Sequence, residues 1–184
     1  MTAAASARWR VLILLGSESD LPQIESGVEL LRALAIPFRA TVASAHRSPE
    51  RVRQLVMEAE QGGAQVIIAV AGLAAHLAGA VAAQTILPVI GVPAAGSLMG
   101  GLDALLSTVQ MPRDIPVATV AVGPTGGYNA AVLAAQILAL SDKRLENELR
   151  ERRGAQAQAV EGAARRVEER LAQHSPGAAP HTSP

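Results

Sequence analysis

Two short polar segments hold side chains that could bind a phosphorylated substrate and transfer a proton. The first, residues 16–20, carries the hydroxyls of Ser17 and Ser19 and the carboxylate of Asp20. Hydroxyl groups and backbone N–H groups at a helix start can bind phosphate, and a carboxylate can accept hydrogen bonds from ribose hydroxyls. We therefore predict that this segment contacts a small phosphorylated substrate.

The second segment, residues 44–49, contains Ser44, His46 and Arg47. Histidine commonly acts as a general acid or base near neutral pH, so His46 is the candidate catalytic residue. Arg47 precedes a predicted helix, where the helix dipole disfavours a cation. A bound phosphate would remove that conflict, which makes Arg47 a candidate phosphate ligand with Ser44 beside it.

Each of these residues also has an interpretation that involves no chemistry. Asp20 could cap a helix over residues 21–35, the serines could be turn residues, and Arg47 could be a solvated charge. His46 could be an inert residue at a helix entrance. The segment 16–20 has a single glycine, so it is neither a Walker loop nor a dinucleotide fingerprint.

A second histidine, His76, follows another apolar run, in an alanine-rich stretch. Such a residue is more often a hydrogen-bonded core histidine than a ligand, but its place at a strand-to-helix turn leaves a substrate-binding role open. We expect no metal site, because cysteine is absent and no carboxylate stands at ligand spacing near either histidine.

The polar segments lie between apolar runs and helical patterns that alternate along the chain. The predicted strands are 11–15, 38–43, 66–71, 88–92 and 117–122. The predicted helices are 21–35, 49–61, 77–85, 102–109 and 128–140. This alternation predicts an α/β fold with a parallel sheet and helices on both faces, in which the strand-to-helix turns share one edge.

The 184 residues predict one main domain with short additions at both ends. We expect a flexible start over residues 1–10, the α/β domain over 11–150, a helical extension over 151–172 and a disordered tail over 173–184. The extension is charged, and its sparse apolar stripe requires a partner surface. Gly154 and Gly162 are its weak points.

Composition excludes several functional classes. The 16 basic and 16 acidic residues give no net charge, so neither a nucleic acid nor a membrane surface is an expected partner. The apolar stretch 66–83 is interrupted by His76 and three glycines, which predicts a strand, a turn and a helix rather than a membrane span. Without a signal-peptide pattern, we expect a cytoplasmic location.

These motifs, taken together, resemble a known enzyme family. The segments 16–20, 44–49 and 71–79, followed by 87–93, 109–112 and 129–135, are similar in order and spacing to the bacterial 5-(carboxyamino)imidazole ribonucleotide mutases. This family is the small catalytic subunit of phosphoribosylaminoimidazole carboxylase in de novo purine biosynthesis. The resemblance covers about residues 11–149.

The resemblance implies a three-layer flavodoxin-like fold, no metal and no organic cofactor. It also implies a homo-octamer with sites at subunit junctions, and a functional link to the ATP-dependent carboxyaminoimidazole ribonucleotide synthase. In such an assembly, Leu145 and Leu149 would pack on a neighbouring subunit.

The implied reaction moves a carboxylate from the exocyclic nitrogen of the substrate to its ring carbon, through carbon dioxide held in the pocket. The product is 5-amino-1-(5-phospho-D-ribosyl)imidazole-4-carboxylate. By match to the family, His46 shuttles the proton, Ser17, Ser19 and Arg47 hold the phosphate, and Asp20 holds the ribose. The base and carboxylate pocket is lined by Gly72, Ala74, His76 and Leu77.

The chain departs from the bacterial pattern at Leu73 and Asp114, where glycine is usual, and at Ala78, where proline is usual. A more polar stretch is replaced by Ala-Ala-Gly at residues 94–96. Leu73 keeps open a carboxylase that takes aminoimidazole ribonucleotide and carbon dioxide. Leu73 and Asp114 together keep open a non-catalytic nucleotide-binding relative.

Overall fold

The computed structural model of the protein describes residues 9–96 and 98–173. These residues fall into two compact units, which divide between Leu145 and Glu146. The first unit holds the sheet and its covering helices, and the second holds most of the last helix. The predicted flexible start lies outside the described residues up to residue 8, and so does the predicted disordered tail from residue 174.

Five parallel strands form one sheet in the order β2-β1-β3-β4-β5. They are β1 (Val11–Leu15), β2 (Phe38–Val42), β3 (Val66–Ala71), β4 (Val89–Pro93) and β5 (Ala118–Thr119). β1 lies between β2 and β3, with Val11 paired to both Phe38 and Val66. This is the strand order of a flavodoxin-like doubly wound sheet, so the predicted fold class is confirmed.

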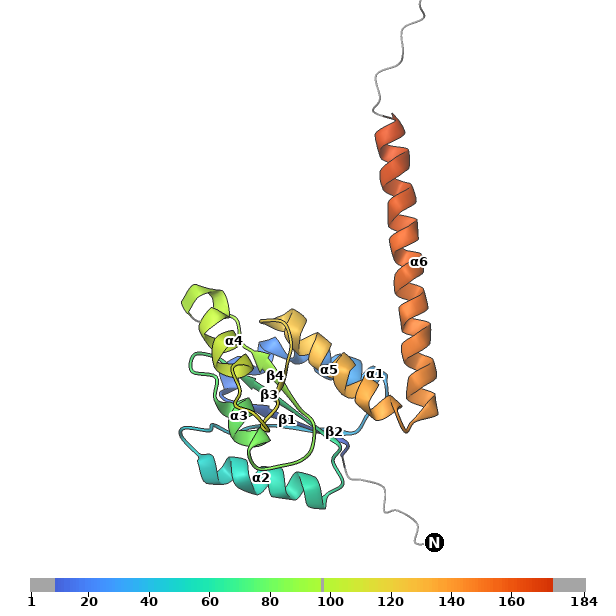
Figure 1. The fold of residues 1–184 in the computed structure, drawn as a ribbon. Coiled ribbons are helices and arrows are strands. Elements are labelled where there is room, and N and C mark those ends of the chain that lie inside the picture. Colours follow the sequence, from blue (N-terminus) through green and yellow to red (C-terminus); the bar gives the residue numbers. More distant parts are fainter. Residues whose placement is uncertain (1–8, 97, 174–184) are drawn as a thin grey trace, which may run out of the picture. The chain divides into compact units, whose positions relative to one another are not determined.

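Helices cover both faces of this sheet (Figure 1). On one face, α2 (Pro49–Gln61), α3 (Leu77–Ala82) and α4 (Leu102–Val109) pack against alternate strand residues such as Leu12, Leu14 and Ile67. On the other face, α1 (Glu25–Ala33) packs against α5 (Pro124–Ala139). Two short 3-10 helices, η1 (Glu18–Gln23) and η2 (Leu98–Gly101), follow β1 and β4, and α6 (Lys143–Gln173) ends the described chain.

The predicted strand over 117–122 is wrong in length, because β5 pairs over only two residues at the sheet edge. Val120 still donates a hydrogen bond to the carbonyl of Gly91, but the chain then leaves the sheet and enters α5. That helix begins at Pro124, four residues earlier than predicted. Gly126 and Gly127 therefore lie inside this helix, near its start.

Other elements also differ from the prediction. The helix predicted over 21–35 is split into η1 and α1, so Asp20 lies inside η1 and does not cap a helix that starts at residue 21. The stretch 66–83 forms β3, a turn and α3, as predicted, although α3 ends at Ala82. Gly154 and Gly162, the predicted weak points of the extension, do not interrupt α6, which continues through both.

The ends of the α/β unit are joined by an ion pair. The Arg10 guanidinium donates a hydrogen bond to Asp142 at 2.7 Å, and this bond lowers the pKa of the Asp142 carboxyl. Trp9 is buried beside it, and Leu145 has no exposed surface within its own chain. The prediction that Leu145 packs on a neighbouring subunit is therefore wrong.

Close contact between α1 and α5 depends on glycine. A Cβ atom added at Gly27 would lie 2.5 Å from the carbonyl oxygen of Gly127. One added at Gly127 would collide with the carbonyl oxygen of Gln23, at the end of η1. These two glycines let the helix backbones touch, which fixes the position of η1 above the sheet.

None of the helices in the described part of the chain combines the length and apolar character that a membrane crossing requires.

Replacing Gly127 with alanine should therefore destabilise the α/β unit by roughly 2–3 kcal/mol, because the added methyl group meets backbone atoms that cannot rotate away. Urea unfolding followed by circular dichroism measures this change. Gly154→Ala is the matched control, since a Cβ there meets nothing within 4 Å. The control should leave stability unchanged or raise it by up to about 1 kcal/mol. Equal stability of both variants would contradict this packing argument.

Candidate active site

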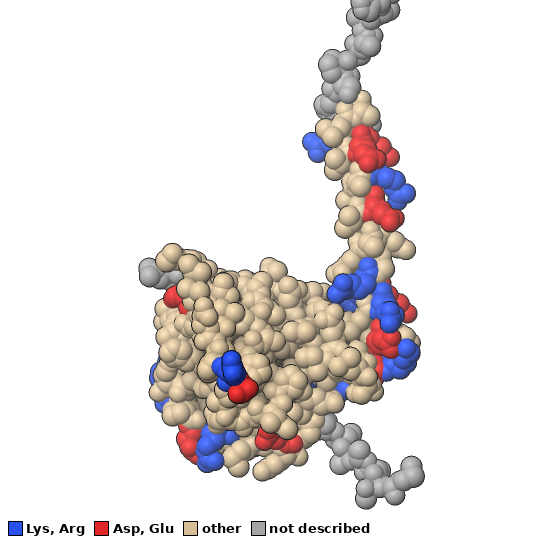
Figure 2. Space-filling model, in the orientation of Figure 1, with Lys and Arg blue, Asp and Glu red and all other residues tan. Residues whose placement is uncertain are grey.

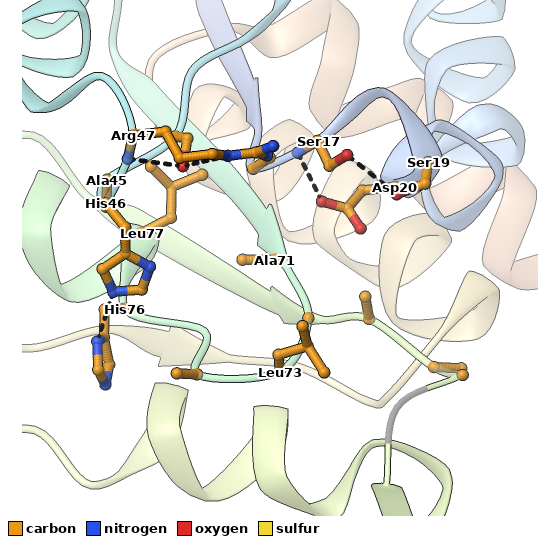
Figure 3. Close-up of a pocket in the computed structure, with 17 residues that line it drawn as sticks. Ser17, Ser19, Asp20, Ala45, His46, Arg47, Ala71, Leu73, His76 and Leu77 are labelled. Carbon is orange, nitrogen blue, oxygen red and sulfur yellow. Dashed lines mark hydrogen bonds between the residues drawn. The ribbon is translucent and has the colours of Figure 1, made fainter.

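A cavity of about 730 Å³ opens at the carboxyl ends of β1, β2, β3 and β4 (Figure 3). All ten residues that the sequence predicts for the site line it: Ser17, Ser19, Asp20, Ser44, His46, Arg47, Gly72, Ala74, His76 and Leu77. Ligands of open α/β sheets bind at this edge. The parallel sheet thus brings together side chains that are up to 60 positions apart in the chain.

Seven further residues line the cavity without having been assigned a role: Gly16, Ala45, Ala71, Leu73, Ala94, Ala95 and Gly96. Most are glycine or alanine and offer only backbone or a methyl group, so residue type alone could not single them out. Residues 94–96 directly follow β4. The rule that ligands bind beyond the carboxyl ends of strands could have found this segment.

The first polar segment forms a compact turn. The Ser17 backbone N–H donates to Asp20 Oδ2 at 2.9 Å, and the Ser19 hydroxyl donates to the Ser17 hydroxyl at 3.1 Å. Asp20 is 9% exposed, whereas Ser19 is exposed and Ser17 half-buried. Asp20 therefore closes the turn through its carboxylate, and the serine hydroxyls stay accessible from the cavity.

Burial raises the pKa of the Asp20 carboxyl above its ordinary value. The hydrogen bond from the Ser17 N–H and the positive charge of Arg47 act in the opposite direction, but the loss of hydration is the larger effect. Any ligand that donates hydrogen bonds to this carboxylate stabilises its charged form.

Arg47 connects the second polar segment to the first. Its guanidinium donates to the carbonyl oxygen of Gly16 at 3.1 Å, and its backbone N–H donates to the Ser44 hydroxyl at 3.2 Å. Ser44 in turn is held by Ser48, which donates its hydroxyl hydrogen to the Ser44 carbonyl. Arg47 lies before α2 and is exposed to solvent. Its positive charge is thus directed at the turn that carries the serine hydroxyls.

The two histidines of the cavity contact each other. His46 Nε2 and His76 Nδ1 are 2.9 Å apart, and the two rings meet edge to face at 79°. This hydrogen bond exists only when one of the two nitrogens carries a proton and the other does not. Both side chains are exposed, so His76 is not a core histidine. The pair therefore places two side chains that are able to transfer protons at the side of the cavity.

Leu73 has a strained backbone, with φ at +56°. The left-handed conformation costs a non-glycine residue about 1–2 kcal/mol. Asp114, the other position where the resembled family has glycine, also has a positive φ of 71°. Aspartate tolerates this conformation better than leucine does. The fold therefore keeps at both places the backbone shape that glycine favours, while the side chains differ.

The described residues contain no cluster of three or more histidine, cysteine, aspartate or glutamate side chains placed to hold a metal ion.

Comparison with known proteins identifies relatives of this chain. Residues 10–159 match a family model described as AIR carboxylase. The Escherichia coli N5-carboxyaminoimidazole ribonucleotide mutase is 48% identical over 151 residues, which cover 82% of this chain and 89% of the relative. A Candida albicans phosphoribosylaminoimidazole carboxylase is 50% identical over 137 residues, which cover 74% of this chain but 24% of that longer protein.

The fold also matches a solved structure. The crystal structure of Treponema denticola PurE superposes with a TM-score of 0.78 at 29% sequence identity. The match covers 85% of this chain and 97% of that one. The agreement of fold and sequence extends over the elements that build the cavity.

Asp20→Asn should make the folded protein more stable at neutral pH. The raised pKa means that the folded state binds the Asp20 proton more tightly than the unfolded state does. The stabilising effect of this carboxyl is therefore complete below its ordinary pKa of 3.8 and is lost as the pH rises through the raised value. An asparagine oxygen can accept the same Ser17 hydrogen bond without a charge.

Urea unfolding of both proteins at a series of pH values measures this difference. The stability advantage of Asp20→Asn should grow from acid to neutral pH. A variant that is less stable than the original protein at neutral pH would show that the charged form of Asp20 is favoured by the fold.

Proposed function

The chain belongs to the AIR carboxylase family, and from this premise we propose that it is a mutase acting on 5-(carboxyamino)imidazole ribonucleotide. It moves the carboxylate from the exocyclic nitrogen to the ring carbon and forms 5-amino-1-(5-phospho-D-ribosyl)imidazole-4-carboxylate, in purine biosynthesis. One observation carries the proposal for this site: a single cavity combines a serine-rich turn, an arginine and a pair of hydrogen-bonded histidines.

The polar turns hold the ribose phosphate in this proposal. The hydroxyls of Ser17 and Ser19 donate to the phosphate, and the Arg47 guanidinium exchanges the Gly16 carbonyl for a phosphate oxygen. Ser44 supports Arg47 through the hydrogen bond to its backbone. Asp20 accepts hydrogen bonds from the ribose hydroxyls. These contacts leave the ring and its carboxylate to the β3–α3 turn.

Gly72, Ala74, His76 and Leu77 form the pocket for the base and carboxylate. Gly72 and Ala74 are half-buried and exposed respectively, and neither carries a side chain larger than a methyl group. Leu77 is buried, so it forms the floor. A flat ring can therefore lie against the turn, with its reacting edge toward the histidine pair.

The proposed reaction breaks one bond and forms another. When the bond between the exocyclic nitrogen and the carboxylate carbon breaks, its electron pair stays on nitrogen and carbon dioxide is released. His46 protonates that nitrogen. The ring carbon then attacks carbon dioxide with its own electron pair, and His46 takes the proton that this carbon loses. The histidine ends in its starting state, so one residue serves both steps.

Confinement makes the second step possible. Carbon dioxide that stays beside the ring reacts at a high effective concentration, whereas carbon dioxide that diffuses away is lost. His76 orients His46 through the 2.9 Å contact.

A second candidate function is a carboxylase that takes aminoimidazole ribonucleotide and free carbon dioxide. It is favoured by Leu73, which stands where the mutases have glycine, and by the Candida albicans relative that carries the carboxylase name. The two functions differ in their need for bicarbonate. Product formed from the carboxyamino substrate without added bicarbonate supports the mutase.

We also propose that the protein is a homo-octamer and that it works in the cytoplasm. An ATP-dependent synthase supplies its substrate. Exposed apolar side chains support association: Leu102, Leu106 and Val109 on α4 are 38%, 48% and 48% exposed, and Ile86 is 99% exposed. Figure 2 shows few charged side chains over α4 and α5, whereas charges gather over α2. An α4 surface of this kind is typical of a protein interface.

His46→Asn should abolish the conversion of 5-(carboxyamino)imidazole ribonucleotide, with a loss of at least about 100-fold in kcat, because asparagine cannot transfer a proton. Proton NMR of the substrate and its ring-carboxylated isomer measures the rate. Binding of the nucleotide and the melting temperature should stay close to those of the original protein. His76→Asn is the companion variant and should keep more activity, since an amide can still hydrogen-bond to His46. Turnover at the original rate in His46→Asn would overturn the assignment of His46.

Light scattering on the purified full chain should give a particle mass eight times the 18.9 kDa of one chain. A particle with the mass of a single chain would contradict the octamer. Leu106→Glu should lower the mass, because a charge on α4 cannot be buried unpaired between copies.

A further inference from the structure

The segment that follows β4 forms one wall of the cavity with little side-chain packing. Ala94 still donates its N–H to the carbonyl oxygen of Ala71 in β3. Ala95 and Gly96 line the cavity and are exposed, and a Cβ atom added at Gly96 would meet nothing within 4 Å. Because side chains hold this segment so weakly, its position depends on the hydrogen bonds of its backbone.

One of these hydrogen bonds comes from a different wall of the cavity. The Ala95 N–H donates to Gln23 Oε1 at 3.2 Å. Gln23 is half-buried and is the last residue of η1, the short helix that also carries Ser19 and Asp20. Gln23 itself does not line the cavity. Its side-chain amide therefore joins the turn that offers polar groups to a ligand with the segment after β4.

This hydrogen bond connects elements that the sheet keeps apart. η1 follows β1 and residues 94–96 follow β4, and β3 lies between these two strands. His46 follows β2, on the other side of β1, and Figure 3 shows both histidines apart from Asp20. The bond from Gln23 thus lies at the end of the cavity assigned above to the ribose, away from the groups that transfer protons.

The side chain and the main chain of Gln23 make separate contacts. Its carbonyl oxygen lies against α5, where a Cβ atom added at Gly127 would collide with it. Its amide lies beside Gly123, where an added Cβ would be 3.5 Å from Oε1 and 3.1 Å from Ala95 Cβ. The backbone of η1 is thus positioned without the amide. A substitution at Gln23 can remove the bond to Ala95 while Asp20 keeps its place.

We propose that Gln23 is a positioning residue that sets the width of the cavity at its ribose end. By accepting the Ala95 N–H, it holds residues 94–96 at a fixed distance from the turn that carries Asp20, so that a bound ribonucleotide contacts both walls. The identity of this ligand rests on the proposed mutase function. Without the bond, the ligand itself must order the segment, which weakens binding. The proton transfers at His46 keep their rate.

Steady-state kinetics of Gln23→Met test this role. Methionine has a similar length but no strong hydrogen-bond acceptor at its end. The KM for 5-(carboxyamino)imidazole ribonucleotide, followed by proton NMR, should rise about fivefold, which is the scale of one lost hydrogen bond. The kcat should stay within about twofold of the original value. Calorimetric titration with aminoimidazole ribonucleotide should show binding that is weaker by about the same factor.

Hydrogen exchange of the free protein measures the segment directly. In Gln23→Met, the peptide that spans residues 94–96 should exchange at least about threefold faster, whereas peptides from β1 and α5 should be unchanged. Gln23→Glu should restore both the exchange rate and the KM, because a carboxylate oxygen accepts the same bond. Salt at about 0.15 M limits the effect of the added charge.

Gln54→Met is the matched control. Gln54 is also an exposed glutamine, and its amide donates to Glu58 within α2, away from the cavity. This variant should leave the KM, the titration and the exchange of residues 94–96 unchanged.

The outcomes separate the two proposals. An unchanged KM in Gln23→Met, or a raised KM that Gln23→Glu does not restore, would overturn the role of Gln23 while the mutase function stands. If the original protein makes no product from the carboxyamino substrate, the proposed function falls. The titration with aminoimidazole ribonucleotide and the exchange of residues 94–96 then decide the role of Gln23 without turnover.

Discussion

The parallel pairing of β1 with β2 on one side and β3 on the other is the constraint on which the site depends. Because these strands run the same way, the turns that follow them emerge at one edge of the sheet. The turn after β1 brings the serines and Asp20, the turn after β2 brings His46 and Arg47, and the turn after β3 brings His76. A hydrogen bond from Arg47 to the Gly16 carbonyl then joins the first two turns directly. No single segment contains the site; the order of the strands assembles it.

Small side chains make this assembly compact. With aromatic residues at 2% of the chain, the core is built from aliphatic residues and alanine, and glycines let helices touch through their backbones. The contact of Gly27 with Gly127 holds α1, α5 and the end of η1 together. Small residues also line the cavity: most of the lining residues at the ends of β3 and β4 are alanine or glycine.

The site contains features that lower the stability of the fold. The Asp20 carboxyl is buried with a raised pKa, and Leu73 holds a left-handed backbone with most of its side chain in solvent. Hydrogen bonds that a ligand donates to the carboxylate would offset the first of these costs. Local strain and unfavourable burial at a site are typical of residues kept for binding rather than for folding.

The sequence by itself determined the fold class, the strands β1 and β3, the helices α2 and α4, and all ten residues that line the cavity as predicted. The strands, the helices and the polar site residues follow from local patterns: continuous apolar runs, proline and serine at helix starts, and polar segments directly after strands. Gly72, Ala74 and Leu77 came only from the resemblance to a known family. Only the tertiary structure decided the rest. The length of β5 depends on how far the chain can follow β4 at the sheet edge, and the early start of α5 depends on contact with η1 and α1. The burial of Leu145, the contact of the two histidines and the exposure of Leu73 likewise arise from residues distant in sequence. Such contacts leave no periodic signal in the chain, because they are set by where the elements pack and not by the residues next to them.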